Sequence, residues 1–316
     1  MRSNSHPATV SHAAAVLIIA AVAAIWGGGF PMTRFALDSG VSVGALMSLR
    51  FILAGVLMLI IIRGKRIPIV RRGVLDGVWL GLILAVIFWS QTDGMRFTTT
   101  AKSGFITGLY VLLTPLLAVA IGQRIKLSSA VGVVIAVFGL YLLVGSATSG
   151  HAWFGQVNRG DLETFVCAAL CAVHIIMMGA FARRTNAWLL AGTQVIVGGV
   201  ISVIVTAFLP APFGFQNLPQ TLPKLTVAGP TIYLALFSTV FAFWGQAVAQ
   251  TRLGPVEAAL LFCIEPVTAA VLSVVWLKEP MTSRQAIGGG LIVAAMIVSE
   301  ALPYMYRAIT IPDTRP

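Results

Sequence analysis

Long apolar runs alternate with short polar breaks along the whole chain. The breaks carry turn and charge signals such as "RGKRIPIVRRG" and "PAPFGFQNLPQTLPK". Each run is long enough to cross a hydrocarbon core of about 30 Å as a helix. A membrane β-barrel would instead alternate apolar and polar residues in segments of about ten. The sequence therefore predicts an all-α polytopic membrane protein with ten transmembrane helices, over residues 13–35, 42–62, 73–92, 98–121, 128–145, 161–181, 187–209, 226–250, 255–277 and 285–306.

Composition agrees with this pattern. Hydrophobic residues make up 58% of the 316 positions and charged residues only 10%, whereas a soluble domain carries about 25% charge. The net charge of +11 would suggest nucleic acid in a soluble protein, but here the basic residues are scattered through short loops. We therefore expect the protein to lie in a lipid bilayer and not to bind nucleic acid.

The basic residues instead indicate the orientation of the chain. One set of loops and tails contains Arg2, Arg63, Lys65, Arg66, Arg71, Arg72, Arg124, Lys126, Arg183, Arg184, Arg252, Arg307 and Arg315. The opposite set contains Arg34, Arg96, Lys102, Arg159, Lys224, Lys278 and Arg284. Cytoplasmic loops are the richer in Lys and Arg, so both termini are predicted to be cytoplasmic.

The first apolar run also resembles a signal peptide, because Ala21-Val22-Ala23 has the A-x-A form of a cleavage site. The preceding segment, however, has only Arg2 as a positive charge, and apolar character continues to Phe35. We expect this first helix to be retained.

Two parts of the chain resemble each other. Residues 94–115 align without a gap with 245–266, so that Thr114-Pro115 meets Glu265-Pro266. Five helices per half is an odd number, so the second half enters the membrane from the opposite side, as in many secondary transporters. The predicted organisation is a first repeat over 13–145, a second over 161–306, and cytoplasmic tails over 1–12 and 307–316.

Glycine and proline are expected to break three of these helices. Glycine permits close approach, and proline leaves a backbone carbonyl without its helical partner. Tight packing through small residues is the alternative interpretation. The candidate hinge or gating residues are Gly27, Gly28, Gly29, Pro31, Pro115 and Pro266.

Several short motifs occur in the order and spacing of one transporter family. They are Trp26-Gly27…Phe30…Arg34, Leu49-Arg50-Phe51, Thr114-Pro115, Glu265-Pro266 and Leu277-Lys278-Glu279. Over residues 13–306 the chain resembles the EamA family of the drug/metabolite transporter (DMT) superfamily, which includes YddG-type amino-acid exporters. One departure is Gln123-Arg124 in the first repeat, where the second has Lys278-Glu279.

The resemblance implies two five-helix repeats and export of amino acids or other small metabolites across the bacterial inner membrane. It also implies that helices 1, 3, 4, 6, 8 and 9 surround a central cavity. No cofactor, no metal and no enzymatic activity are expected, since the H-E-x-x-H and Walker A motifs are missing from the sequence.

Ionisable residues inside membrane spans are often functional. Arg50 either clamps a substrate carboxylate or makes a fixed contact with backbone carbonyls or a buried acid. Glu265 either couples export to protons or satisfies polar groups freed by the helix break, and the structural role is favoured. Glu257 fits the first turn of a helix, where the helix dipole suits an acid.

His174 shares a helix face with Cys167 and Cys171. A site for a soft metal ion would need more ligands than these, with Cys263 the only further cysteine, so a packed core is favoured. His174 is instead a candidate for lining the cavity.

Aromatic and polar side chains complete the set of candidates, because an apolar cavity with few polar anchors suits uncharged or aromatic amino acids. The substrate-binding candidates are Trp26, Phe30, Arg50, Trp89, Thr107, Tyr110, His174, Phe241, Trp244, Gln246 and Glu265. A drug or metal-ion exporter of the same fold is the alternative function.

Overall fold

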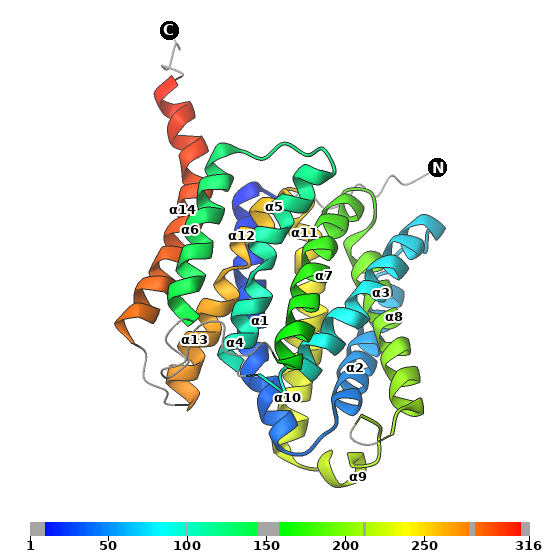
Figure 1. The fold of residues 1–316 in the computed structure, drawn as a ribbon. Helices are drawn as coiled ribbons and strands as arrows, with labels where there is room; N and C mark the ends of the chain where they lie inside the picture. The colour runs from blue at the N-terminus through cyan, green and yellow to red at the C-terminus, as the bar shows by residue number, and fades with distance from the viewer. Residues whose placement is uncertain (1–9, 99, 145–157, 211–212, 278–281, 311–316) are drawn as a thin grey trace, which may run out of the picture.

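Ten helical passes run back and forth in the computed structural model, which describes residues 10–98, 100–144, 158–210, 213–277 and 282–310 (Figure 1). Seven of the passes are unbroken helices: α1 (His12–Asp38), α2 (Val43–Gly64), α3 (Arg71–Gly94), α6 (Leu127–Val144), α7 (Arg159–Ala182), α8 (Ala187–Phe208) and α14 (Ser283–Thr310). A short helix, α9 (Leu218–Thr221), lies in the loop before the eighth pass.

The other three passes are divided. The fourth consists of α4 (Thr100–Gly108) and α5 (Tyr110–Ala120), and the ninth of α12 (Pro255–Leu261) and α13 (Ile264–Leu277). The eighth contains α10 (Leu225–Ala235), a π-helical turn η1 (Leu236–Phe241) and α11 (Ala242–Ala249). Within the described residues, seven helical segments are long and apolar enough to cross a membrane, and three more are apolar but shorter. The prediction of an all-α polytopic membrane protein is confirmed.

Polar residues in the loops fix where several helices begin. Ser11 and Ser42 each accept a hydrogen bond at Oγ from the backbone N–H three residues later, at 3.2 and 3.1 Å. Asn186 accepts at Oδ1 from the N–H of Trp188 at 2.9 Å. Such caps satisfy N–H groups that have no partner inside the helix. They lie within a few residues of the predicted helix starts.

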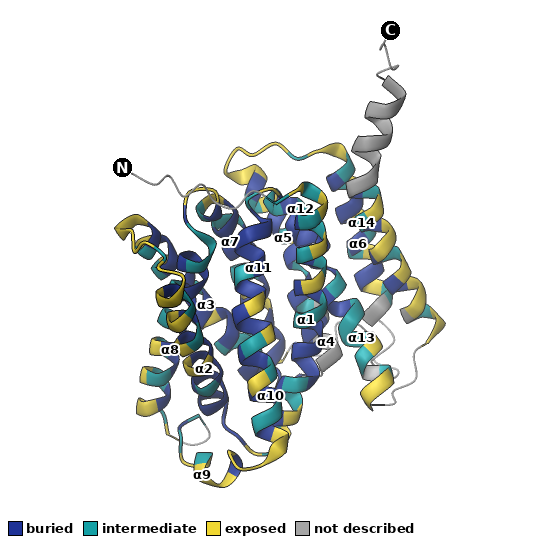
Figure 2. Cartoon of the chain, turned by 180° about the vertical axis from the view of Figure 1, so that it is seen from behind, coloured by how far each residue is buried: buried dark blue, intermediate teal, exposed yellow. Residues whose placement is uncertain are grey.

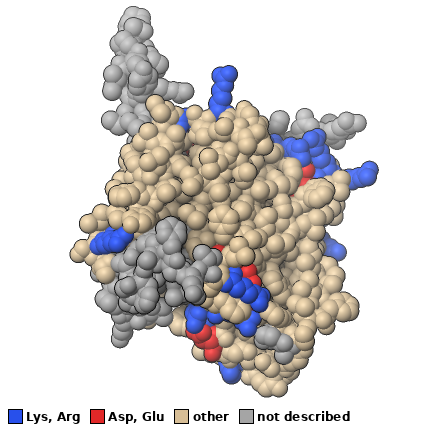
Figure 3. Space-filling view, in the orientation of Figure 1, with Lys and Arg blue, Asp and Glu red and all other residues tan. Residues whose placement is uncertain are grey.

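The outward faces of the bundle are apolar. Figure 2 shows exposed residues along the outer sides of the helices, and among them are Ile60, Trp79, Val134 and Phe208. Most of the face in Figure 3 has neither acidic nor basic side chains. A soluble monomer rarely exposes apolar area on this scale, so lipid is the solvent that this surface fits.

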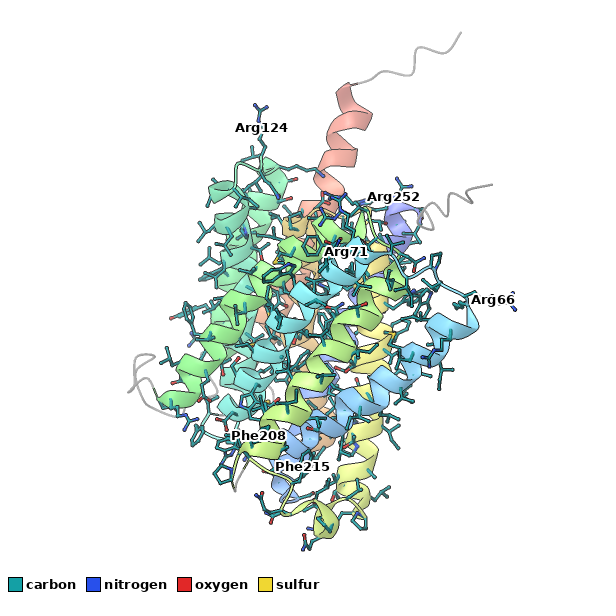
Figure 4. The ribbon with its side chains drawn as sticks, turned by 90° about the vertical axis from the view of Figure 1, so that its right-hand side faces the viewer. Arg66, Arg71, Arg124, Phe208, Phe215 and Arg252 are labelled. Atoms are coloured by element: carbon teal, nitrogen blue, oxygen red, sulfur yellow. The ribbon has the colours of Figure 1, made fainter. Side chains whose placement is uncertain are left out.

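Basic residues gather toward one end. Figure 4 shows Arg71, Arg124 and Arg252 toward the end of the bundle where α1 begins, and Phe208 and Phe215 toward the opposite end. We call the first the basic end and the second the aromatic end. Helix α14 also ends on the basic side (Figure 1).

The two halves pack in a reciprocal pattern. Helix α1 contacts α13 and the α10–α11 pass, while α7 contacts the α4–α5 pass and α3. The fifth helix of each half, α6 and α14, packs against its counterpart, as do α2 and α8. An inverted repeat produces such exchanged neighbours. The residue limits of the repeats and the two tails stay a prediction, and 1–9, 145–157 and 311–316 lie outside the described residues.

The expected helix breaks at glycine and proline are wrong in position. Helix α1 runs unbroken through Gly27–Gly29 and Pro31, α5 through Pro115, and α13 through Pro266. The interruptions lie earlier, at Leu109 and at 262–263. Proline removes only its own N–H bond to the carbonyl four residues before it, so the disturbance falls on the preceding turn.

Candidate functional site

A cavity of about 70 Å³ opens between the helices of both halves. It is lined by side chains from α1, α2, α3, α4, α5, α7, α10, η1, α11 and α13, and by Phe262 between α12 and α13. In terms of passes these are 1, 2, 3, 4, 6, 8 and 9. The second pass, which contributes Arg50, was not among the expected cavity helices. Eight of the substrate-binding candidates line the cavity: Trp26, Phe30, Arg50, Thr107, Tyr110, His174, Gln246 and Glu265.

Arg50 links α2 to the π-helical turn. Its Nε donates to Thr239 Oγ1 at 2.7 Å, and its Nη2 donates to Ser238 O at 3.2 Å and Ser238 Oγ at 3.1 Å. The guanidinium also lies 4.1 Å from the ring centroid of Phe88. No carboxylate among the described residues forms an ion pair with Arg50. Its charge is therefore buried against neutral acceptors and an aromatic face.

The π-helical turn supplies these acceptors. The N–H of Ala242 bonds to Phe237 O, five residues back, and to Thr239 O, but not to Ser238 O. Ser238 O accepts instead from Trp26 Nε1 at 2.9 Å and from Arg50. A π-turn inside an α-helix often marks a functional site. Here it turns one backbone carbonyl toward α1 and α2.

Glu265 is the acidic group of the cavity, and it is 7% exposed. Tyr110 Oη lies 3.2 Å from Glu265 Oε2 and 3.0 Å from Phe262 O. Pro266 has no N–H and cannot make the helical bond to Phe262 O, which accepts instead from Tyr110 Oη and from the N–H of Glu265 at 2.8 Å. No Lys, Arg or His in the described chain pairs with Glu265. Like Arg50, it is a buried ionisable group without an opposite charge.

The three glycines of α1 allow close packing at the same depth. A Cβ on Gly27 would lie 2.5 Å from Glu265 O, and one on Gly28 would lie 2.5 Å from Tyr233 Oη. Gly29 lines the cavity. Gly27 and Gly28 therefore permit tight helix packing. A role as hinges stays a prediction for both glycines and for Pro31, Pro115 and Pro266.

The cavity extends past this level toward the basic end. His174 Nε2 lies 2.9 Å from Gln194 Oε1, and Gln246 Nε2 donates to Gln250 Oε1 at 3.0 Å. Gln250 in turn donates to the backbone oxygen of Ile175 at 2.9 Å. Gly245, beside Gln246, lies against Ile18 and Val22, which precede Trp26 on α1. We call the part lined by His174, Ile175 and Gln246 the blind end.

Beyond the blind end the bundle is packed. Ala15, Ile19, Ala249, Leu253 and Ala259 are all 0% exposed and belong to one apolar cluster. On the other side the cavity reaches Thr33 and Met95, near the ends of α1 and α3. The cavity therefore extends toward the aromatic end and is closed toward the basic end.

Comparison with known proteins agrees with this architecture. The sequence profile of the EamA-like transporter family matches residues 13–145 and 158–300. The chain belongs to this family. Its members are transporters and not enzymes, so the expected absence of enzymatic activity follows from family membership.

Relatives of this EamA-family chain extend over most of its length. An uncharacterized transporter of Archaeoglobus fulgidus is 30% identical over 281 residues, which are 89% of this chain and 83% of the relative. The uncharacterized inner membrane transporter YedA of Escherichia coli is 23% identical and covers 90% of each chain. A crystal structure with 19% sequence identity covers 94% of this chain at a TM-score of 0.74. It shows the shared fold.

Three aromatic candidates do not line the cavity of this EamA transporter. Trp89 packs near Phe213, at 6.3 Å between ring centroids, and Trp244 stacks on Trp188 at 4.9 Å. Phe241 is 36% exposed. They lie outside the cavity lining, and their contact with substrate stays a prediction.

The π-helical turn explains the displacement of Phe241. In a regular α-helix, Phe241 follows Leu234 and Ser238 by seven and three residues and would share their face. The extra residue in the turn rotates the rest of the pass, so that Phe243 and Gln246 line the cavity instead. Ser238, Phe243 and Phe262 are among the lining residues that sequence reasoning missed. The hydrophobic pattern contains no signal for a π-turn.

The soft ligands of α7 do not build a metal centre. Cys167 Sγ and Cys171 Sγ are 3.9 Å apart. Within the part of the chain that the structure describes, no group of three or more His, Cys, Asp or Glu residues is arranged to hold a metal ion. The geometry therefore gives no support to the alternative of a metal-ion exporter.

Proposed function

We propose that this transporter exports amino acids or similar small metabolites by alternating access, as the YddG-type exporters that it resembles do. We place it in the inner membrane of a bacterium, with both termini in the cytoplasm. The observation that carries the proposal is the pair of buried ionisable groups in one cavity. Arg50 and Glu265 come from opposite halves, and neither has a partner of opposite charge among the described residues.

An amino-acid zwitterion has the two groups that this cavity lacks. Isolated charges are costly inside a membrane, and they are stabilised by opposite charges that bind with them. Arg50 Nη1 makes no hydrogen bond to the described residues, so it is free to donate to a carboxylate. Glu265 Oε1 is equally free to accept from an ammonium group. Trp26, Phe30 and Phe88 supply the apolar walls.

The packing of the two halves supports alternating access. The cavity is closed toward the basic end by side chains from α1, α11 and α12, and it extends toward the aromatic end. Equivalent helices of the two halves have equivalent neighbours. If the two halves exchange these contacts, the cavity closes toward the aromatic end and opens toward the basic end. With the basic end in the cytoplasm, the structure corresponds to the state that releases substrate outside.

Counterflow in liposomes tests the function. Purified protein is reconstituted with internal unlabelled amino acid, and uptake of external labelled threonine, methionine or phenylalanine is followed against empty liposomes. We expect uptake above the empty control for at least one of the three. Failure of all three, with folded protein in the liposomes, would refute amino-acid transport. A parallel screen with drugs and metal ions would then identify the alternative substrate class.

A further inference from the structure

The blind end of the cavity contains more polar atoms than an apolar substrate side chain needs. His174, Gln194 and Gln246 are 4%, 0% and 1% exposed. Gln246 Oε1 and Gln194 Nε2 are buried and have no hydrogen-bond partner. Burying a polar atom without a partner costs about 1–3 kcal/mol, so each such atom in a native protein needs an explanation.

The hydrogen bonds of His174 and Gln246 determine which of their polar atoms have no partner in the described chain. Gln194 Oε1 only accepts, so His174 donates to it through Nε2–H. In the neutral ring, Nδ1 is then an acceptor, and no group in the described chain donates to it. Gln246 uses an N–H on Gln250, which leaves its carbonyl oxygen as a second acceptor without a donor. Two residues that line the cavity therefore each have a side-chain acceptor with no donor among the described residues.

Both acceptors lie beyond the level of Arg50 and Glu265. Gln246 is next to Gly245, which contacts Ile18 and Val22 on α1. Trp26, which shares the Ser238 carbonyl with Arg50, lies at least one turn further along α1. His174 lies one turn beyond Cys171 on α7, and the Phe243 ring is 6.0 Å from the imidazole. A substrate held by its backbone charges at Arg50 and Glu265 would direct its side chain here.

We propose that the blind end is a side-chain subsite that selects amino acids with uncharged N–H or O–H donors, and a primary amide above all. This inference rests on the proposed function, because it assumes that an amino acid occupies the cavity. An amide NH2 group has two hydrogens, one for His174 Nδ1 and one for Gln246 Oε1. A hydroxyl has one hydrogen and satisfies one acceptor. An apolar side chain satisfies neither and displaces any water that does.

Pairs of amino acids of equal size separate the contribution of side-chain hydrogen bonds from that of side-chain size. Glutamine and methionine are close in length, and threonine and valine have nearly the same shape. Sites built to hydrogen-bond a substrate group discriminate strongly against analogues that lack it. In counterflow competition, the wild-type transporter should prefer glutamine over methionine by about tenfold or more, and threonine over valine by less.

Two substitutions of Gln246 test the residue. Gln246→Met keeps length and volume but removes the acceptor, so the preference for glutamine over methionine should fall to about twofold or less while methionine is still transported. Gln246→Glu keeps an acceptor and adds a charge, so it should retain the discrimination and gain competition by lysine. Ile60→Val, on the outward face of α2 and away from the cavity, is the control and should leave the ratio unchanged.

The outcomes separate the two proposals. Wild-type preference for glutamine that Gln246→Met abolishes supports the subsite. Equal competition by glutamine and methionine, or a preference that survives in Gln246→Met, overturns the subsite but leaves amino-acid transport intact. No competition by any amino acid against any substrate overturns the proposed function and, with it, the ligand assigned to the blind end. Retained methionine transport by Gln246→Met shows that the variant is folded.

Discussion

Tyr110 donates its hydroxyl proton to the carbonyl oxygen of Phe262, 3.0 Å away, across the boundary between the two halves. Both residues lie at interruptions of their passes, Tyr110 just after Leu109 and Phe262 just before Cys263. Pro266 cannot donate to Phe262 O, so this carbonyl accepts instead from the hydroxyl and from the N–H of Glu265 at 2.8 Å. The same hydroxyl lies 3.2 Å from Glu265 Oε2.

Tyr110→Phe removes this hydroxyl and leaves the aromatic ring in place. We expect destabilisation of about 0.5–1.5 kcal/mol, because the buried carbonyl of Phe262 loses one of its two donors. Transport should also fall by about tenfold, because Glu265 loses its neighbour in the cavity. Thermal unfolding in detergent and counterflow in liposomes measure the two effects. Ile204→Val, on the exposed face of α8, should change neither, and an unaltered Tyr110→Phe protein would contradict the proposed link.

Variants of Arg50 distinguish a role in binding the substrate carboxylate from a role in fixed structural contacts. The guanidinium already has fixed contacts with Thr239 and Ser238, while its Nη1 remains for a ligand. Arg50→Lys keeps the charge but loses the forked geometry, whereas Arg50→Gln loses both. If the charge binds substrate carboxylate, Arg50→Gln should raise the half-saturating concentration by about tenfold or more, and Arg50→Lys by less.

Thr239→Val is the matched control for the fixed contact. It removes the acceptor of Arg50 Nε without changing the charge of the cavity. We expect a lower unfolding temperature with substrate affinity within about twofold of wild type. Equal affinity in Arg50→Gln and wild type would assign Arg50 to structure alone.

The sequence predicts the passes well because lipid imposes a simple rule. Every backbone group must be satisfied within a helix, so length, apolarity and turn signals define each span. The packing partners of Gly27 and the shared carbonyl of Ser238 depend on helices that are 188 residues or more apart in sequence. No local pattern contains that information.

Deviations inside helices were the main source of error for the site. A regular 3.6-residue period places Phe241 on the face of Ser238, but the π-helical turn brings Phe243 there instead. Proline was read as the position of a break, while the interruption at 262–263 lies before Pro266. Arg50, His174 and Glu265 were found because polar residues are rare inside apolar runs.

Gly27→Ala tests the close contact between α1 and α13. The added methyl group would lie 2.5 Å from Glu265 O and 2.7 Å from Thr268 Cβ, so a helix must shift. Overpacking of this kind costs about 1–3 kcal/mol. We expect a lower unfolding temperature in detergent and slower counterflow. Gly290→Ala in α14 is the control, since nothing lies within 4 Å of its added Cβ, and it should be at least as stable as wild type.

Side-specific labelling tests which face the cavity opens to. In a variant with Cys167, Cys171 and Cys263 replaced by alanine, a cysteine at Thr33 lies in the cavity and one at Ala259 lies in the packed layer. With the basic end in the cytoplasm, an impermeant maleimide added to intact cells should label Thr33→Cys. Ala259→Cys should react only from the cytoplasmic side and faster during turnover, because the closed layer opens in the opposite state. Labelling of Thr33→Cys from the cytoplasm alone would reverse the orientation, and equal labelling of both positions from one side would contradict alternating access.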